Sequence, residues 1–505
     1  MEGITENITE NTTGNKEGLF EEENVVELKG RHSKRENTNI IGKLITLIQL
    51  TVSVGLVIIL WNSGLIPVKF LMIGLAVLLA LFAGTFAMQF LRSYVRIPGM
   101  VLSIVITVIL AVGITYFSQA DKTLKSIGGA AYKTDNMIVV VKKTNKAENL
   151  LQAKNFRFGY QTAADQKNNE RMLEDVQSVV GREIKLVDYP SIQEEAQALL
   201  DGKVEAAIYN EAFTGIIEEA IEGYSEEVRI LYQYGIDTEI PQEEKDIGKP
   251  FHIYISGIDV AGPITTNSRS DVNLIMTVNP DTKQILLTTT PRDYYVRIPN
   301  VSGKSRDKLT HAGIYGVDCS MATLENIYDI DIAYYARVNF TSLIEIIDAV
   351  GGIDVESKYE FTTLHGNYDI KKGVNHMDGD MALGFARERY SFAEGDNQRG
   401  KNQEAVLAAI LKKAMSPAIL KNASKILASV GDSVETNMTT DEMARFIQMQ
   451  MEDGSGWEIK SQASTGKGDK QACFSSGSQK LYVMWPDKES VEANSEQMKQ
   501  VLEGK

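Results

Sequence analysis

The chain has 505 residues, which is too long for one typical domain, so we expect two or three folded units. Its formal net charge is −15 at pH 7, and we expect no nucleic-acid partner. The two cysteines and five histidines are scattered and match no zinc-binding spacing, which argues against a zinc enzyme.

Three uncharged apolar runs follow the first forty residues: Leu44–Trp61, Phe70–Leu91 and Ile97–Phe117. Each has about the ~20 residues that a helix needs to cross the hydrocarbon core of a bilayer. We therefore predict three transmembrane helices within residues 40–118, with the lipid bilayer as a partner. A cleaved signal peptide is excluded, because the first run starts too deep in the chain and two more runs follow it.

Basic residues in the short flanks predict the orientation of these helices. They precede the first helix and separate the second from the third: Lys29, Arg31, Lys34, Arg35 and Lys43, then Arg92 and Arg96. The positive-inside rule places both flanks in the cytoplasm, so residues after 118 are expected outside a multi-pass cell-membrane protein. Residues 1–39 are polar and acidic and are predicted to be a disordered cytoplasmic tail.

Residues 119–249 are predicted to be an extracellular accessory domain with its linkers. From about Met137 to Ile236 strand-like and helical runs alternate, as in an α/β module. The stretch "SIQEEAQALLDGKVEAAIYNEAF" resembles one lobe of the extracytoplasmic solute-binding proteins. A sensor of a small ligand or glycan and a rigid spacer remain alternatives, and the spacer is favoured.

Residues 250–505 open with three closely spaced strands, "FHIYISGID", "VNLIMTVNP" and "QILLTTTPRD", and continue as mixed helices and strands. The mixture predicts an α-β-α domain, in which a central mixed sheet is covered by helices on both faces. Such sheets commonly carry their chemistry at strand ends and in the adjoining loops. The part after about residue 430 is a less certain extension, to which we assign no role.

Four polar clusters follow or interrupt the apolar runs of this last domain: "SGIDVAGPITTNSRSD", "TTTPRDYYV", "KSRDKLTHAG" and "GFARERYSFAEGDNQRGKNQEAV". Their ionisable side chains are, in chain order, Asp259, Arg269 and Asp271; Arg292 and Asp293; Arg306, Lys308 and His311; and Arg387, Arg389 and Arg399. Ordinary surface ion pairs are the alternative interpretation, and His311 is expected to be a structural hydrogen-bonding residue.

Clustered arginines favour phosphate chemistry, because a guanidinium group presents a planar fork of donors that matches phosphate oxygens. Asp259 and Asp271 would oppose an anion unless a hard cation lay between, and Mg²⁺ typically takes one or two carboxylates plus phosphate oxygens. Arg387 and Arg389 are two residues apart, so they share a face only if their helix ends near Arg387. We expect Arg399 to come from the start of the next helix.

Six motifs in this order resemble the LytR-CpsA-Psr family of Gram-positive cell-wall proteins: "RSDVNLIMTVNP", "TTTPRDYYVRIP", "DKLTHAGIYG", "NFTSLIEIIDAVGGIDV", "DGDMALGFARERY" and "GDNQRGKNQEAV". The resemblance covers about residues 251–415, and the three-helix anchor with its accessory module is similar to the capsule-associated branch of that family. One departure is Gly316-Val317, where the family often has a double glycine.

The resemblance implies an Mg²⁺-dependent phosphotransferase that moves a glycopolymer, such as teichoic acid or capsule, from polyprenyl pyrophosphate to a peptidoglycan acceptor. It places Asp259 and Asp271 at the metal. The implied pyrophosphate-binding residues are Arg269, Arg292, Arg387, Arg389, Arg399 and Gln403, and the implied catalytic residues are Asp271, Arg292, Asp293, Arg387 and Arg389. Whether Asp271 or Asp293 accepts the proton of the attacking hydroxyl stays open.

Two rival functions remain: a hydrolase that splits polyprenyl pyrophosphates with water, and a non-catalytic regulator or sensor of the cell envelope. Leu343, Ile346, Ile347 and Val350 have helical spacing and could line a slot for the polyprenyl tail, although core packing is the default for such a stripe. Cys319 and Cys473 are both expected outside the cell, where a disulfide between them is predicted, with two separate buried thiols as the alternative.

Overall fold

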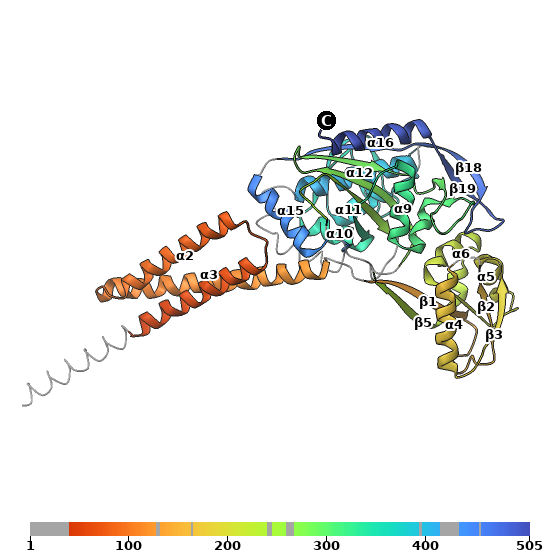
Figure 1. Cartoon of the computed structure of the whole chain (residues 1–505), viewed down its shortest axis with the longest axis horizontal. Helices are drawn as coiled ribbons and strands as arrows, with labels where there is room; N and C mark the ends of the chain where they lie inside the picture. The colour runs from red at the N-terminus through yellow and green to blue at the C-terminus, as the bar shows by residue number, and fades with distance from the viewer. Residues whose placement is uncertain are drawn as a thin grey trace, which may run out of the picture. The chain divides into compact units, whose positions relative to one another are not determined.

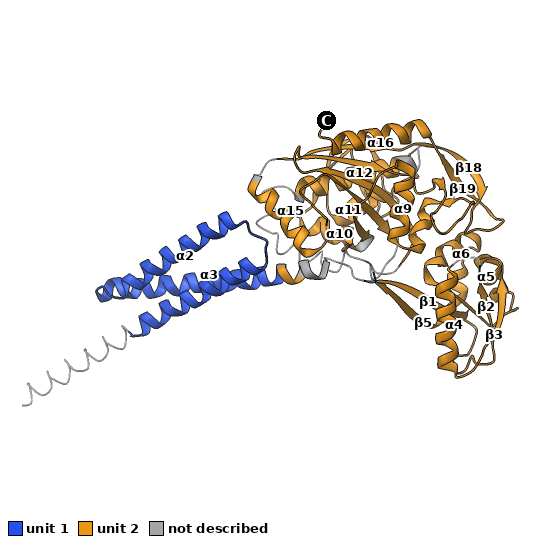
Figure 2. Ribbon diagram, viewed as in Figure 1, with its two compact units in different colours: residues 1–119 blue, residues 120–505 orange. Residues whose placement is uncertain are grey.

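The computed structural model describes residues 40–127, 132–162, 165–239, 245–258, 267–392, 396–414, 434–453 and 456–505. They belong to two compact units, which divide the chain between Gln119 and Ala120 (Figure 2). The predicted tail, residues 1–39, and the predicted metal ligand Asp259 lie outside the described residues.

The first unit contains three helices that are long and apolar enough to cross a membrane: Ile40–Asn62, α2 (Val68–Met88) and the first part of α3 (Ser93–Ile127). Their number and positions confirm the prediction. The buried Gln49 side chain joins all three helices, because its Oε1 accepts hydrogen bonds from Thr85 Oγ1 (2.9 Å) and Ser103 Oγ (2.7 Å). Polar side chains commonly link helices in this way inside an apolar bundle.

The second unit begins with the accessory module, whose five-stranded sheet has the order β3-β2-β4-β1-β5 (Figure 1). Strand β2 runs parallel to β3 and β4, and β1 runs antiparallel to β4 and β5. The strands are β1 (Tyr132–Lys142), β2 (Arg157–Gln161), β3 (Lys185–Tyr189), β4 (Ala206–Asn210) and β5 (Val228–Glu239).

Helices cover both faces of this sheet. Met172 and Val176 of α4 (Gln166–Val180) pack on one face, and Leu199 of α5 and Ile217 of α6 pack on the other. The remaining bounds are α5 (Ile192–Leu200), η1 (Glu211–Phe213), α6 (Thr214–Ala220) and α7 (Tyr224–Glu227).

The C-terminal domain is built on a six-stranded mixed sheet with the order β16-β11-β6-β7-β8-β17. Strands β6, β7 and β8 form an antiparallel meander, while β11 pairs parallel with β6 and β17 pairs parallel with β8. The strands are β6 (Phe251–Ile258), β7 (Ser270–Asn279), β8 (Gln284–Thr289), β11 (Tyr334–Asn339), β16 (Val434–Thr436) and β17 (Glu458–Ala463).

Neighbouring residues along these strands pack against different helix layers, since side chains alternate across a strand. Ile275 and Leu286 belong to the core under α8 (Leu309–Ala312), α9 (Val317–Tyr328) and α16 (Lys488–Leu502). Leu274 and Leu287 belong to the core under α12 (Asp396–Ala414) and α15 (Thr440–Asp453). The α-β-α architecture with a central mixed sheet is therefore confirmed.

Shorter elements surround the sheet. They are β9 (Tyr295–Val296), β10 (Asp307–Lys308), η2 (Gly313–Tyr315), α10 (Phe340–Ala349), β12 (Ile353–Ser357), β13 (Phe361–Thr362), β14 (Asp369–Ile370), β15 (Gly373–Met377), α11 (Gly379–Arg387), β18 (Gly466–Ala472) and β19 (Lys480–Pro486). The described region after residue 430 contributes β16 and β17, which are the two edge strands of the main sheet.

Candidate active site

The site begins where β7 starts and β8 ends. These strands are antiparallel neighbours, so the first residues of β7 and the turn after β8 lie at the same end of the two strands. Asp271 is the second residue of β7, and Arg292 follows β8. Arg292 Nη1 lies 2.9 Å from Asp271 Oδ1, which also accepts a hydrogen bond from Thr310 Oγ1 at 3.2 Å.

The second half of the site comes from the segment after α11. This helix ends at Arg387, as predicted, and Glu388 takes an extended conformation with φ −67° and ψ 130°. The buried Glu388 carboxylate accepts hydrogen bonds from the backbone N–H groups of Leu364, Tyr390 and Ser391 at 2.6, 2.8 and 3.0 Å. Glu388 thus holds the loop through three backbone N–H groups.

The five arginines that the resemblance assigns to the pyrophosphate meet at one cavity of about 450 Å³, whereas Arg306 lines a different pocket. The walls of this arginine cavity are formed by Gly257, Arg269, Asp271, Val272, Arg292, Leu364, His365, Arg387, Glu388, Arg389, Tyr390, Arg399 and Gln403. Arg399 comes from the first turns of α12, as predicted. The wall thus carries five guanidinium groups and two carboxylates, Asp271 and Glu388, and this excess of positive charge suits a polyanion.

Two further pockets share walls with this cavity. A pocket of about 130 Å³ shares Asp271, Arg292, Arg399 and Gln403 and adds polar residues from the C-terminal part of the chain. A pocket of about 80 Å³ shares Gly257, Val272, Arg387 and Gln403 and is otherwise almost entirely apolar. The arginine-rich cavity therefore adjoins a polar compartment and an apolar one.

Electrostatics keep the Asp271 carboxyl group ionised. Burial alone would raise its pKa, but the nearby Arg292, Arg269 and Arg399 guanidinium groups outweigh burial and lower the pKa below its ordinary value of 3.8. Such a carboxylate is a weak general base near neutral pH. Asp293 directly follows Arg292 in the chain and is buried, with Oδ1 3.0 Å from Lys308 Nζ and Oδ2 3.8 Å from Arg292 Nε.

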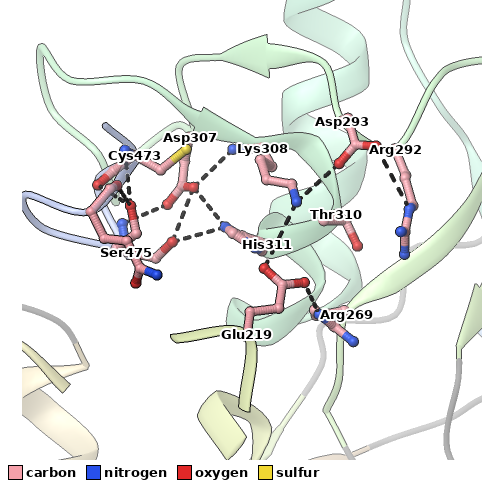
Figure 3. A network of polar contacts seen from close by, with 12 residues as sticks. Glu219, Arg269, Arg292, Asp293, Asp307, Lys308, Thr310, His311, Cys473 and Ser475 are labelled. Atoms are coloured by element: carbon pink, nitrogen blue, oxygen red, sulfur yellow. Dashed lines mark hydrogen bonds and ion pairs between the residues drawn. The ribbon is translucent and has the colours of Figure 1, made fainter. Parts of the chain in front are cut away.

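A second network lies beside the arginine cavity (Figure 3). The fully buried His311 places Nδ1 2.6 Å from Asp307 Oδ1 and 2.8 Å from Ser475 Oγ. Burial would raise the pKa of Asp307, but His311 and the hydrogen bonds around the carboxylate lower it. This network ties β10 and α8 to the loop after β18, so His311 has the structural role that was expected.

Both cysteines are free thiols, which overturns the predicted disulfide. The reason is their different surroundings. Cys319 lies on α9 near Lys133 and Asp318. Cys473 directly follows β18 in the chain and is buried near Asp307 and Lys308. Burial raises the pKa of each thiol to about 12.

The apolar stripe along α10 and its C-cap belongs to a core cluster shared with α11 and α12. Ile347 and Val350 are buried in this cluster, and Leu343 and Ile346 pack against it. Leu343 also lines the apolar pocket beside the arginine cavity. Core packing therefore accounts for all four residues, and of these four only Leu343 also lines that pocket.

Several wall residues were not foreseen. Ser464 and Thr465 directly follow β17, and Lys401 and Thr289 lie on α12 and β8. Leu364, His365 and Tyr390 line the larger cavity. A polar pair directly after the strand "EIKSQA" was the available signal for Ser464 and Thr465, but only the pairing of β17 with β8 brings them to the site.

Metal ligands are few among the residues that the structure describes. Within them no group of three His, Cys, Asp or Glu side chains is arranged to hold a metal ion. Asp271 is the described member of the predicted pair, since Asp259 falls outside. One ionised carboxylate beside an anion cavity is compatible with Mg²⁺, which completes its shell with phosphate oxygens and water.

The chain thus combines an α-β-α domain that has an arginine-lined cavity with three helices long and apolar enough to cross a membrane. Residues 220–500 match the model of the LytR_cpsA_psr family, which is more than half of the chain. The protein belongs to the LytR-CpsA-Psr family.

Individual relatives share the same part of the chain. The polyisoprenyl-teichoic acid–peptidoglycan teichoic acid transferase TagU of a Bacillus cereus strain is 37% identical over 202 residues, which cover 40% of this chain and 65% of TagU. The enzyme of that name from Enterococcus faecalis is 36% identical over 200 residues, which cover 39% of this chain and 65% of the relative. The chain thus spans less than two thirds of each relative.

Among solved structures, B. subtilis TagV is 27% identical, with a TM-score of 0.44, and the match covers 51% of this chain and 98% of TagV. TagT bound to LI-WTA is 26% identical with a TM-score of 0.42, and the match covers 52% of this chain and 94% of TagT.

Proposed function

We propose that this protein is a membrane-anchored phosphotransferase that moves an anionic glycopolymer from polyprenyl pyrophosphate to peptidoglycan. The observation that carries the proposal is the convergence of Arg269, Arg292, Arg387, Arg389 and Arg399 on one cavity that adjoins an apolar pocket. A polyprenyl pyrophosphate has the same two parts, a doubly charged phosphate group and an apolar chain. The names of the TagU relatives support teichoic acid as the class of glycopolymer.

The reaction follows from the groups at the site. A hydroxyl oxygen of the acceptor attacks the phosphorus that carries the glycan, forming a new P–O bond. The bond between this phosphorus and the bridging oxygen breaks, and polyprenyl phosphate leaves with the electron pair. The arginines stabilise charge on the transferring group and on the leaving phosphate. The hydroxyl proton goes to a base, for which Asp271 and Asp293 are the two candidate carboxylates.

Mg²⁺ is part of the proposal. Asp271 would hold it, together with Asp259 and oxygens of the donor, and the ion would supply additional positive charge for the phosphoryl oxygens. The arginine neighbours that lower the pKa of Asp271 support this role, because a metal ligand must be deprotonated. Direct titration of Mg²⁺ into the protein tests this part independently of turnover.

We also propose that the catalytic domain lies on the outer face of the membrane, where a polyprenyl-linked donor and peptidoglycan are accessible. The basic flanks of the three helices support this orientation. Protease added to intact protoplasts should then digest the part after Gln119, and full protection of that part would refute the orientation.

The function is tested with the full chain in lipid vesicles, a synthetic polyprenyl-pyrophosphate glycan, Mg²⁺ and peptidoglycan fragments. A phosphodiester-linked product, detected by its mass, supports transfer. Release of glycan phosphate without a linked product would instead identify a hydrolase.

A further inference from the structure

The accessory module contacts the segment that carries one of the cavity arginines. The Arg269 Nη1 group pairs with Oε1 of Glu219, which lies on α6 of the module. The other carboxylate oxygen, Glu219 Oε2, lies 3.8 Å from Lys308 Nζ, and Lys308 in turn pairs with Asp293. Figure 3 shows Glu219 between Arg269 and Lys308. One carboxylate of the module thus bridges two cations at the candidate active site.

The shape of α6 fits the guanidinium group. A Cβ atom added at Gly215, one helical turn before Glu219, would lie 3.1 Å from Arg269 Cζ and 3.1 Å from Arg269 Nε. Such contacts are closer than ordinary van der Waals distance. The absence of a side chain at Gly215 therefore allows the guanidinium group to lie against the helix.

A second contact holds the same segment two residues earlier. Asn267 is 2% exposed, and its Nδ2 donates a hydrogen bond of 2.6 Å to Oδ1 of Asp135, which lies on β1 of the module. Asp135 is also buried, so this bond is shielded from water. Asp135 and Glu219 together fix residues 267–269, which directly precede β7.

The module is held in place by apolar packing. Ile314 of η2 is 1% exposed and belongs to the same core cluster as Ile216 and Ile217 of α6. The neighbouring Tyr315 ring meets Phe213 edge to face, with 5.8 Å between ring centroids. This packing gives Glu219 a fixed base from which to orient Arg269.

We infer that the accessory module is part of the catalytic apparatus, and that Glu219 is a positioning residue that orients Arg269 toward the pyrophosphate of the donor. This inference rests on the proposed function. This role of the accessory module differs from that of a spacer, which would leave the active site unchanged. It also differs from that of a sensor, which would need its own ligand.

A simple charge effect and a positioning role predict opposite changes in anion binding when the Glu219 carboxylate is removed. Removing a negative charge near an anion site strengthens anion binding by simple Coulomb attraction, whereas loss of arginine orientation weakens it. We expect Glu219→Ala to weaken binding of inorganic pyrophosphate and to raise the KM for the synthetic donor, each about tenfold. Glu219→Gln keeps an oxygen acceptor for Arg269 and should restore binding to within about twofold of the wild type.

The double variant shows whether Glu219 acts through Arg269. We expect Glu219→Ala to add no further loss to Arg269→Ala, since coupled residues are not additive. Lys133→Gln is the matched control, because it removes another ion pair across the same interface, between Lys133 Nζ and Asp318 Oδ2 at 3.7 Å. This control should leave pyrophosphate binding unchanged.

The experiment uses the full chain in detergent, with calorimetry for pyrophosphate and hydrogen exchange for residues 267–270. Unchanged or tighter binding by Glu219→Ala, additive losses in the double variant, or equal losses in Lys133→Gln would each overturn the inference. Faster exchange at 267–270 in Glu219→Ala supports it without any ligand. If the wild type binds no pyrophosphate, the proposed function fails, and the exchange measurement alone decides whether Glu219 holds this segment.

Discussion

Arg292 Nη1 lies 2.9 Å from Asp271 Oδ1, which links the turn after β8 to the start of β7 at the wall of the arginine cavity. This pair fixes the direction of a guanidinium group before any substrate arrives. Preorganised charge of this kind stabilises a transition state without reorganisation during the reaction.

Asp271→Asn should lower the transfer rate by about two to three orders of magnitude, because it removes the charge that orients Arg292 and the proposed Mg²⁺ ligand. Mg²⁺ affinity, measured by calorimetry, should fall as well.

The folded pKa of Asp271 is depressed, so its stabilising effect is present above the unfolded pKa and is lost as the pH falls through the folded pKa. The difference in Tm between wild type and variant should therefore shrink below pH 3.8. A normal rate in the presence of a chelator would contradict metal assistance.

Arg389→Lys should reduce transfer nearly as much as Arg389→Ala. Lysine keeps the charge but lacks the planar fork, and it loses the stacking of Arg389 Cζ at 4.6 Å from the centroid of the Tyr390 ring. The expected loss is ~3–4 kcal/mol of transition-state stabilisation, measured as kcat/KM for the synthetic donor. Arg297→Lys, at an exposed position away from this cavity, is the matched control and should have normal activity. Near-normal transfer by Arg389→Lys would contradict bidentate phosphate binding.

Glu404 predicts a pH dependence of stability. Burial raises its pKa from 4.5 to about 7 against the opposing effect of hydrogen bonds from Thr289. Because the folded pKa is raised, the native state binds more protons in this interval, and stability falls as the pH rises from 4.5 to about 7. Glu404→Gln is neutral and should gain stability over the wild type, on the order of 3 kcal/mol, between about pH 5 and about pH 8. Parallel Tm curves for the two proteins across this range would refute the shift.

The free thiols predict the outcome of alkylation. When the chain is denatured without reductant, both Cys319 and Cys473 should react, so the mass should rise by two alkyl groups. In the native state the reaction should be slow at neutral pH, because burial raises the pKa of both thiols to about 12 and the thiolate is the reactive form. If the two cysteines reacted only after prior reduction, the result would show that they form a disulfide and would contradict the free thiols.

Local patterns in the sequence were sufficient for the features that depend on local chemistry. Hydropathy located the three apolar helices, and the spacing of Arg387 and Arg389 located the end of α11. The grouping of the arginines was also predictable, because each lies close to the start or end of a strand or helix.

Long-range pairing could not be predicted in the same way. Strands β16 and β17 are short segments far from their partners in sequence, so only the assembled sheet brings Ser464 and Thr465 to the site. The disulfide was inferred from cysteine count and compartment, and neither quantity contains the direction of the side chains on α9 and after β18. Ile347 has the helical spacing of a slot residue, but spacing does not distinguish a slot from a packed core.

The contact between Glu219 and Arg269 also depends on long-range packing and could not be predicted from local sequence patterns. Fifty residues separate the two side chains in sequence, and Glu219 lies in a module that sequence patterns favoured as a spacer. Docking of Ile314 into the core of that module is what brings the carboxylate to the arginine.

The central claim is that this arginine cavity transfers a glycan phosphate to a sugar hydroxyl, and the most direct measurement is the mass of the product. The full chain in vesicles receives the synthetic polyprenyl-pyrophosphate glycan, Mg²⁺ and peptidoglycan fragments, and Arg389→Ala serves as the inactive control. The proposal predicts a product whose mass equals that of the acceptor plus that of the glycan phosphate, less one water, with polyprenyl phosphate released in equal amount. Free glycan phosphate without a linked acceptor, or no turnover that differs from the Arg389→Ala control, would contradict the claim.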